Sequence, residues 1–150
     1  MSLYYEDVEI GTVSESPGRT ITESDVVAFA ALSGDWNRIH TDAEYAKTTP
    51  FGQRIAHGLL GIAIASGLAV RLGTFADTTI AMLGVDWTFR APVFIGDTVH
   101  LRISVVSKRR TSRGARGLVV RRLELVNQHG AVVQDGTISL MVTARSAEGG

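Results

Sequence analysis

The stretch R-I-A-H-G-L-L-G-I-A-I-A-S-G-L-A-V-R-L, residues 54–72, decides the fold. Its apolar side chains occupy nearly the whole circumference of a helix instead of one stripe, which is typical of a buried helix. Glycine, serine and arginine interrupt it, and it is shorter than the roughly 20 apolar residues that cross a bilayer. Its small residues would let strands approach closely. The stretch therefore predicts a buried central helix and no membrane span.

Beyond Gly73 the hydrophobic period changes from helical to two. Alternating apolar side chains predict four strands separated by glycine and proline turn signals. Such alternation is typical of an antiparallel sheet with one covered face and one wetter face. One curved sheet lying across the central helix makes an α+β fold, in a single domain over residues 1–150. The predicted strands cover residues 83–89, 99–105, 118–126 and 131–143.

The segment before the central helix contains two further helix signals. Thr22 is predicted to cap a helix that ends at Gly34. A capping-box pattern beginning at Thr41 predicts a short helix to about Lys47, which leaves residues 34–40 as a loop. Residues 1–11 are expected to be irregular, and residues 12–21 to form a short strand or an extended arm.

Composition narrows the possible functions. The 150 residues include 15 basic and 15 acidic side chains, so the net charge is zero. A balanced charge argues against a nucleic-acid partner that needs a broad basic field. No cysteine is present, which excludes disulfides, thiolate nucleophiles and cysteine metal ligands. The first ten residues lack the pattern of a signal peptide, so a cytoplasmic location is expected.

Polar groups cluster in the loop S-G-D-W-N-R-I-H, residues 33–40. Asp35, Asn37 and His40 lie within six positions of one another, and His57 and Gly58 open the central helix. From the residues alone, Asp35 could simply cap the turn after the first helix, and His40 could be a polar neighbour of the next helix cap. An Asp and a His that contact one water could instead perform acid–base chemistry.

Three segments together carry a family resemblance. G-D-W-N-R-I-H at residues 34–40, H-G-L-L at 57–60 and W-T-F-R-A-P-V-F-I-G-D-T-V at 87–99 resemble the MaoC-like (R)-specific enoyl-CoA hydratases and dehydratases, also called hydratase 2. The resemblance extends over roughly residues 4–143. It implies a hot-dog fold and reversible hydration of trans-2-enoyl thioesters of coenzyme A or acyl-carrier protein, with no cofactor. Because one sheet around one helix leaves the sheet edges and the outer helix face uncovered, a homodimer or dimer of dimers is also expected.

The resemblance also assigns roles within the site. Asp35 and His40 match the family's catalytic pair, and the backbone N–H of Gly58 matches its oxyanion hole. Asn37 matches an asparagine that shapes the loop. The family usually has proline at the next position, whereas this chain has Arg38, which is expected to loosen the loop and to bring a cation near Asp35 or an anionic substrate. His57 is expected to be a structural histidine that bonds the loop.

A metal site and a phosphate-binding surface are two other possible assignments. Asp35, His40, Asp42 and His57 are of ligand types that bind metals, but their spacing matches no standard zinc signature, and we expect no metal. A basic run extends from Lys108 to Arg122. Contact with coenzyme A phosphates and a solvated hairpin tip explain this run equally well.

Two other functions compete with a hydratase. A hot-dog thioesterase would place a carboxylate on or beside the central helix, and residues 58–70 contain no Asp or Glu. A non-catalytic partner subunit that binds acyl thioesters would not need the polar groups of the site. Retention of all three polar elements therefore favours an enzyme.

Overall fold

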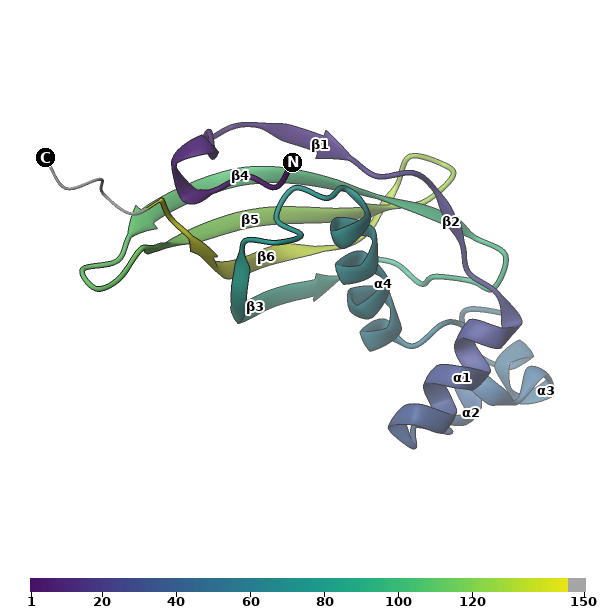
Figure 1. The fold of residues 1–150 in the computed structure, drawn as a ribbon. Coiled ribbons are helices and arrows are strands. Elements are labelled where there is room, and N and C mark those ends of the chain that lie inside the picture. The colour runs from purple at the N-terminus through teal and green to yellow at the C-terminus, as the bar shows by residue number, and fades with distance from the viewer. Residues whose placement is uncertain (146–150) are drawn as a thin grey trace, which may run out of the picture.

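The computed structural model describes residues 1–145, in which a curved antiparallel sheet lies against one long helix (Figure 1). The sheet has six strands in the order β1-β4-β5-β6-β3, and β2 also pairs with β4. Helices α1, α2 and α3 gather at one end of the molecule, away from the sheet (Figure 1). In chain order the elements are a 3-10 turn Tyr5–Asp7, β1 Val13–Glu15, β2 Arg19–Thr20, α1 Glu23–Ser33, α2 Arg38–Thr41, α3 Ala43–Lys47, α4 Gly58–Arg71, β3 Thr79–Phe89, β4 Thr98–Arg110, β5 Arg116–Val126 and β6 Val132–Thr143.

The core lies between α4 and the inner face of β4, β5 and β6. Every second residue is buried along most of β5, over residues 98–103 of β4 and over residues 138–142 of β6, which confirms the predicted alternation in these parts of the strands. The expected arm is present as β1 and β2, which both pair with β4. The core side chains include Leu60, Ile64 and Leu68 of α4, with Val99, Leu101, Val119, Leu123, Leu125, Ile138 and Val142 of the strands.

The prediction that α4 is buried on all sides is wrong for the single chain. Leu59 and Val70 are 62% and 68% exposed, because one layer of sheet covers only one side of the helix. The strand β3 differs in the same way, since it lies at the edge of the sheet and is solvent-exposed on both faces. Its exposed apolar side chains are Ile80, Met82, Leu83, Val85 and Phe89.

The first helix has the predicted ends. The Thr22 hydroxyl accepts a hydrogen bond from the Asp25 N–H at 3.2 Å, and the Asp25 carboxylate accepts one from the Thr22 N–H at 2.8 Å. This reciprocal pair is a capping box. Gly34 ends α1 with φ 76°, a left-handed conformation that glycine adopts without steric cost. The chain therefore turns sharply just before Asp35.

The segment between α1 and α4 departs from the prediction in two places. Residues 34–40 are not all loop, because Arg38–Thr41 form the helical turn α2. The cap of α3 is Asp42, whose carboxylate accepts from the Tyr45 N–H at 2.9 Å, and not Thr41. Thr41 belongs to the preceding turn, where its hydroxyl donates back to the Asn37 carbonyl at 3.2 Å. Thr41 is itself the last residue of α2, whereas an N-cap residue lies outside the helix, as Asp42 does with φ −116° and ψ 102°.

Two glycines of α4 offer a matched test of its packing. A methyl group on Gly61 would overlap the side-chain amide of Gln134 on β6, whereas one on Gly67 would meet nothing within 4 Å. Gly61→Ala is expected to lower the free energy of unfolding by about 1–3 kcal/mol through overpacking. Gly67→Ala is expected to raise it by about 0.5–1 kcal/mol, because alanine loses less backbone entropy in a helix. Urea unfolding of both variants measures the difference, and equal effects would contradict this packing of α4 on β6.

Candidate active site

The loop between α1 and α2 holds Asp35 by local hydrogen bonds. The Asp35 N–H donates to the Ser33 hydroxyl at 3.1 Å, and the Asp35 carboxylate accepts from the Asn37 N–H at 3.2 Å. The Asn37 side chain accepts from the Ile39 N–H at 3.1 Å and so caps α2. This turn role leaves the Asp35 carboxylate with capacity for further hydrogen bonds.

The position of His40 in α2 directs its ring inward. The side chain is 9% exposed, and its Nδ1 lies 2.7 Å from the Ile55 carbonyl oxygen. A carbonyl can only accept, so Nδ1 must carry the proton of this bond. In the neutral ring, Nε2 is then an unprotonated base. The tautomer is thus set by a backbone group 15 positions away.

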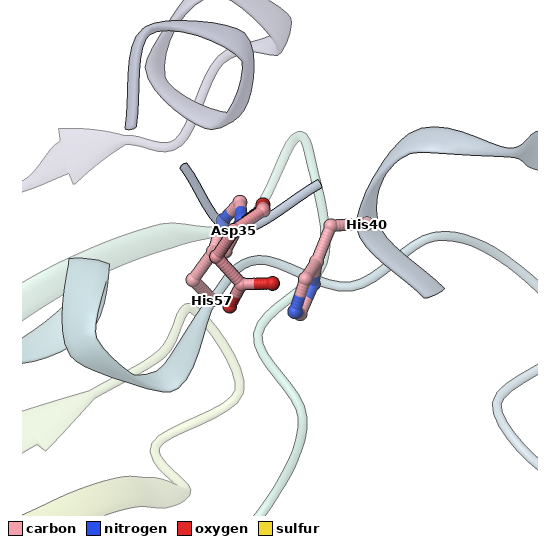
Figure 2. Close-up of side chains that lie close together, drawn as sticks. All are labelled: Asp35, His40 and His57. Carbon is pink, nitrogen blue, oxygen red and sulfur yellow. Dashed lines mark hydrogen bonds between the residues drawn. The ribbon is translucent and has the colours of Figure 1, made fainter. Parts of the chain in front are cut away.

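His57, the residue before α4, joins the loop to the helix start. It is 2% exposed, and its Nε2 donates to the backbone carbonyl of Asp35 at 2.9 Å. Its ring stacks on that of His40 with centroids 3.8 Å apart. Figure 2 shows Asp35, His40 and His57 lying together, and one side-chain ligand atom from each lies within 4.8 Å of the others. Residues 22 positions apart are thereby brought into one site.

Electrostatics favour a neutral His40. Burial lowers the pKa of His40 below its ordinary value of 6.5, and the neighbouring His57 lowers it further. The Ile55 carbonyl and the Asp35 carboxylate act in the opposite direction without cancelling the effect of burial. A histidine with a lowered pKa is unprotonated at pH 7 and can take a proton from water.

An apolar cavity opens where α4 begins. It has a volume of about 530 Å³ and is lined by Gly58, Ile55, Phe89 and Gln134 among others. A Cβ on Gly58 would lie 2.8 Å from the Phe89 ring, so a larger residue here would displace this side chain of β3. Gly58 is the first residue of α4, and N–H groups in a first helical turn have no partner within the helix. The cavity therefore adjoins a free backbone donor.

Comparison with known proteins identifies the family. The family model described as a MaoC-like domain matches residues 7–127. The chain belongs to this MaoC-like family. It is 42% identical over 115 residues to a 3-hydroxybutyryl-CoA dehydratase of Methylorubrum extorquens, with 74% of this chain and 71% of the relative covered. It is 37% identical to an (R)-specific enoyl-CoA hydratase of Rhodospirillum rubrum, with 95% and 93% covered.

Solved structures agree with this assignment. An (R)-hydratase of Pseudomonas aeruginosa in the unliganded form matches with a TM-score of 0.80 at 34% identity, covering 96% of this chain and 88% of that one. The expected hot-dog fold is confirmed for this MaoC-like chain. The expected enzyme class is also confirmed at the level of the family, since the relatives are named as hydratases and dehydratases, which are hydro-lyases.

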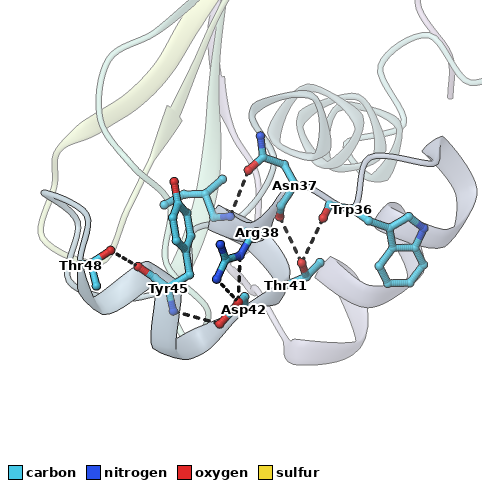
Figure 3. Close-up of polar contacts among 8 residues, drawn as sticks. Trp36, Asn37, Arg38, Thr41, Asp42, Tyr45 and Thr48 are labelled. Carbon is cyan, nitrogen blue, oxygen red and sulfur yellow. Dashed lines mark hydrogen bonds and ion pairs between the residues drawn. The ribbon is translucent and has the colours of Figure 1, made fainter.

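The departure of this MaoC-like chain at Arg38 has a different consequence from the one expected. The Arg38 guanidinium donates to Asp42 at 2.9 and 3.0 Å and lies 4.3 Å from the centre of the Tyr45 ring, so its partners are on α3 and do not include Asp35 (Figure 3). Arg38 is the first residue of α2, where proline is favoured because the missing N–H has no helical partner anyway. Arginine at this position therefore anchors the loop through its side chain.

The histidine pair bears on the question of a metal. Asp35, His40 and His57 have the composition of a metal site in this MaoC-like domain. The two imidazole rings, however, are stacked with an angle of 27° between their planes. Ring lone pairs lie in the ring plane, so nearly parallel rings direct them side by side and not toward a shared ion. The stacked arrangement therefore does not direct the two rings toward one shared ion.

The sequence did not indicate which residues close the cavity. Gln134 lies on β6, and its side-chain oxygen accepts from the Trp87 indole at 3.0 Å. Phe89 is the last residue of β3. Only the register of β3 on β6 brings these side chains to the start of α4, and the alternation of the strands does not specify that register.

Proposed function

We propose that this chain catalyses the reversible addition of water to trans-2-enoyl thioesters of coenzyme A, giving (R)-3-hydroxyacyl thioesters. The observation that carries the proposal is the meeting of Asp35 and the neutral His40 at His57, the residue before α4, while Ile55 and Gly58, on either side of His57 in the chain, line an apolar cavity. The names of the relatives supply the substrate class and the stereochemistry, and the side chains supply the chemistry.

Hydration requires that water become nucleophilic toward C3 while a proton reaches C2. In the proposed mechanism His40 Nε2 and the Asp35 carboxylate hold one water between them. One group removes a proton as the oxygen attacks, and the proton is delivered to C2 from the same pair. In this scheme His57 takes no part in the proton transfer. It positions Asp35 by a hydrogen bond to the Asp35 backbone carbonyl. Asn37 and Arg38 hold the loop through Ile39 and Asp42.

Negative charge develops on the thioester oxygen during the reaction. The Gly58 N–H at the start of α4 is the proposed donor to this oxygen, and the helix dipole adds a partial positive charge there. The acyl chain would occupy the cavity lined by Ile55, Phe89 and Gln134. A thioesterase lacks comparable support, because no residue of α4 is acidic.

The activity can be tested directly. Purified protein would be mixed with trans-2-enoyl-CoA substrates of increasing chain length, and the loss of absorbance of the conjugated thioester would be followed. Matched acyl-carrier-protein thioesters would decide between the two carriers. We expect turnover of at least one coenzyme A substrate in the panel. A panel that stays inert toward coenzyme A substrates would refute the proposal.

Protonation of His40 should affect stability in a defined direction. The pKa of His40 is lowered in the folded chain and returns to about 6.5 on unfolding. Below pH 6.5 the unfolded chain therefore binds more protons than the folded chain, so this contribution to stability is present above pH 6.5 and is lost as the pH falls. Denaturant midpoints at pH 7.5 and 5.5 should differ more for the wild type than for His40→Gln. An equal pH dependence in both would contradict a buried neutral His40.

The proposal includes a homodimer formed at the β3 edge. This edge strand presents unpaired backbone groups, and an antiparallel strand can pair with its own copy about a two-fold axis. Its apolar side chains, with Leu59 and Val70 of α4, supply surface to bury. Light scattering should give twice the chain mass for the wild type and one chain mass for Val85→Lys, with Ile10→Lys as a control away from β3. A monomeric wild type would refute this interface.

No helix among the described residues is long and apolar enough to cross a membrane. The proposal places the enzyme in the cytoplasm, where it would meet coenzyme A thioesters. Cell fractionation with an antibody to the chain tests this location.

A further inference from the structure

Arg121 is a buried cation that the proposed hydratase mechanism does not use. It lies on β5 between Val119 and Leu123, which are core residues on the same face of the strand. The side chain is 8% exposed, and its Nε has no hydrogen-bond partner. The adjacent Arg122 behaves differently, because it points to the outer face and pairs with Asp135 at 2.5 Å. Within the basic run, Arg121 therefore points into the core, whereas Arg122 points to the outer face.

No acidic group among the described residues forms an ion pair with Arg121. Asp7 and Glu9 line one of the two cavities at Arg121, and both oxygens of Asp7 already accept from Arg145 at 2.7 Å. Burial lowers the pKa of Arg121 to about 10, so it keeps its charge at pH 7. An unpaired buried charge is costly to a folded protein, so an anion bound from outside the chain would stabilise the Arg121 guanidinium.

Among the residues that the structure describes, Arg121 has one aromatic contact, which leaves its donors free. Its guanidinium carbon lies 5.3 Å from the centre of the Phe75 ring. Such a contact uses the π-face of the aromatic ring and does not satisfy the N–H groups at the guanidinium edge. That edge can hold a carboxylate by two parallel hydrogen bonds.

Two cavities share Arg121 and Phe75 in their lining. Their volumes are about 240 Å³ and 220 Å³. The first cavity has a mixed lining, with Leu3, Val8, Leu72, Ile103 and Val105 beside the polar residues Asp7, Glu9, Thr12, Ser14 and Thr74. The second cavity is mostly apolar and contains no acidic residue, so it is the better place for the body of an anionic ligand. Its apolar walls are Ala69, Val70, Met82, Leu123, Ile138 and Leu140, of which Val70 and Met82 also lie on the face proposed for the homodimer.

We propose that Arg121 is the anion-binding group of a second ligand site, which takes a small carboxylate with an apolar body. One carboxylate would balance the charge of the one guanidinium, and an alkyl chain would pack against the apolar walls. A phosphate dianion would bring a second charge into an apolar cavity that has no second cation for it. The site lies beside Ala69 of α4, about 16 Å along the helix from Gly58 at 1.5 Å per residue, so it is separate from the proposed active site.

Binding can be measured without any assay of hydration. Octanoate would be titrated into the full chain by calorimetry and by thermal unfolding. Octanol tests the need for charge, octylamine tests its sign, and acetate and inorganic phosphate test the need for an apolar body. We expect octanoate alone to bind and to raise Tm with concentration. Octanol binding as tightly as octanoate, or no binding of octanoate, would overturn the proposal.

Two arginine variants separate this site from other apolar cavities. Arg121→Met removes the charge and keeps the volume, and should weaken octanoate binding at least tenfold while raising the Tm of the free protein. Arg109→Met removes an exposed arginine of β4 and should bind octanoate like the wild type. Unchanged octanoate affinity in Arg121→Met would refute the site. A lower Tm or failure to fold in that variant would show that Arg121 is structural, and would also refute it.

Discussion

Replacing Asp35 with asparagine is expected to lower kcat for hydration of a trans-2-enoyl-CoA by about 100- to 10,000-fold. The amide keeps the size of the side chain, and its oxygen can still accept from the Asn37 N–H, so the turn after α1 is preserved. The group that is lost is the carboxylate that would accept or deliver a proton. KM should change little, because the acyl cavity at the start of α4 does not include Asp35.

Controls distinguish chemistry from folding in this variant. Asp77→Asn changes an exposed carboxylate in the turn before β3 and should leave kcat unaltered. The urea midpoint of Asp35→Asn should stay close to that of the wild type, since the exposed side chain makes one local bond. If Asp35→Asn keeps the full rate, Asp35 is only a turn residue and the proposed mechanism is wrong.

Replacing His40 with glutamine is expected to have an effect of similar size, about 100- to 10,000-fold on kcat. Glutamine can still donate to the Ile55 carbonyl, which the Nδ1–H of His40 does at 2.7 Å, but it offers no base at the position of Nε2. Because burial lowers the pKa of His40, the acid limb of the wild-type rate should lie below pH 6.5. The variant should lose this limb along with the rate.

A double variant tests whether the two residues act as one unit. If Asp35 and His40 hold the same water, Asp35→Asn with His40→Gln should be little slower than either single variant. Independent roles would instead multiply the two losses. His129→Gln, in the exposed turn before β6, serves as the matched histidine control and should keep the wild-type rate and pH profile. A His40→Gln variant with the wild-type pH limb would exclude His40 as the titrating base.

Local signals in the sequence were enough for much of the fold. Thr22 and Gly34 mark the ends of α1 because a capping box and a left-handed glycine depend on residues within a few positions. The alternation in β4, β5 and β6 gave their buried faces for the same reason. Thr41 was the failure of this kind, since it is the last residue of α2, a helical turn that was not predicted, and the cap of α3 is Asp42.

The sequence by itself determined a central apolar helix, an alternating antiparallel sheet and the polar motif from Asp35 to His40. Only the tertiary structure decided that His57 bonds the Asp35 carbonyl, that His40 bonds the Ile55 carbonyl, and that Arg121 points into the core beside Phe75. The physical reason is the separation along the chain between the groups that interact. Caps and periodicity act between neighbours along the chain, whereas the tautomer of a histidine and the partners of a buried charge depend on groups that only packing and strand register bring together.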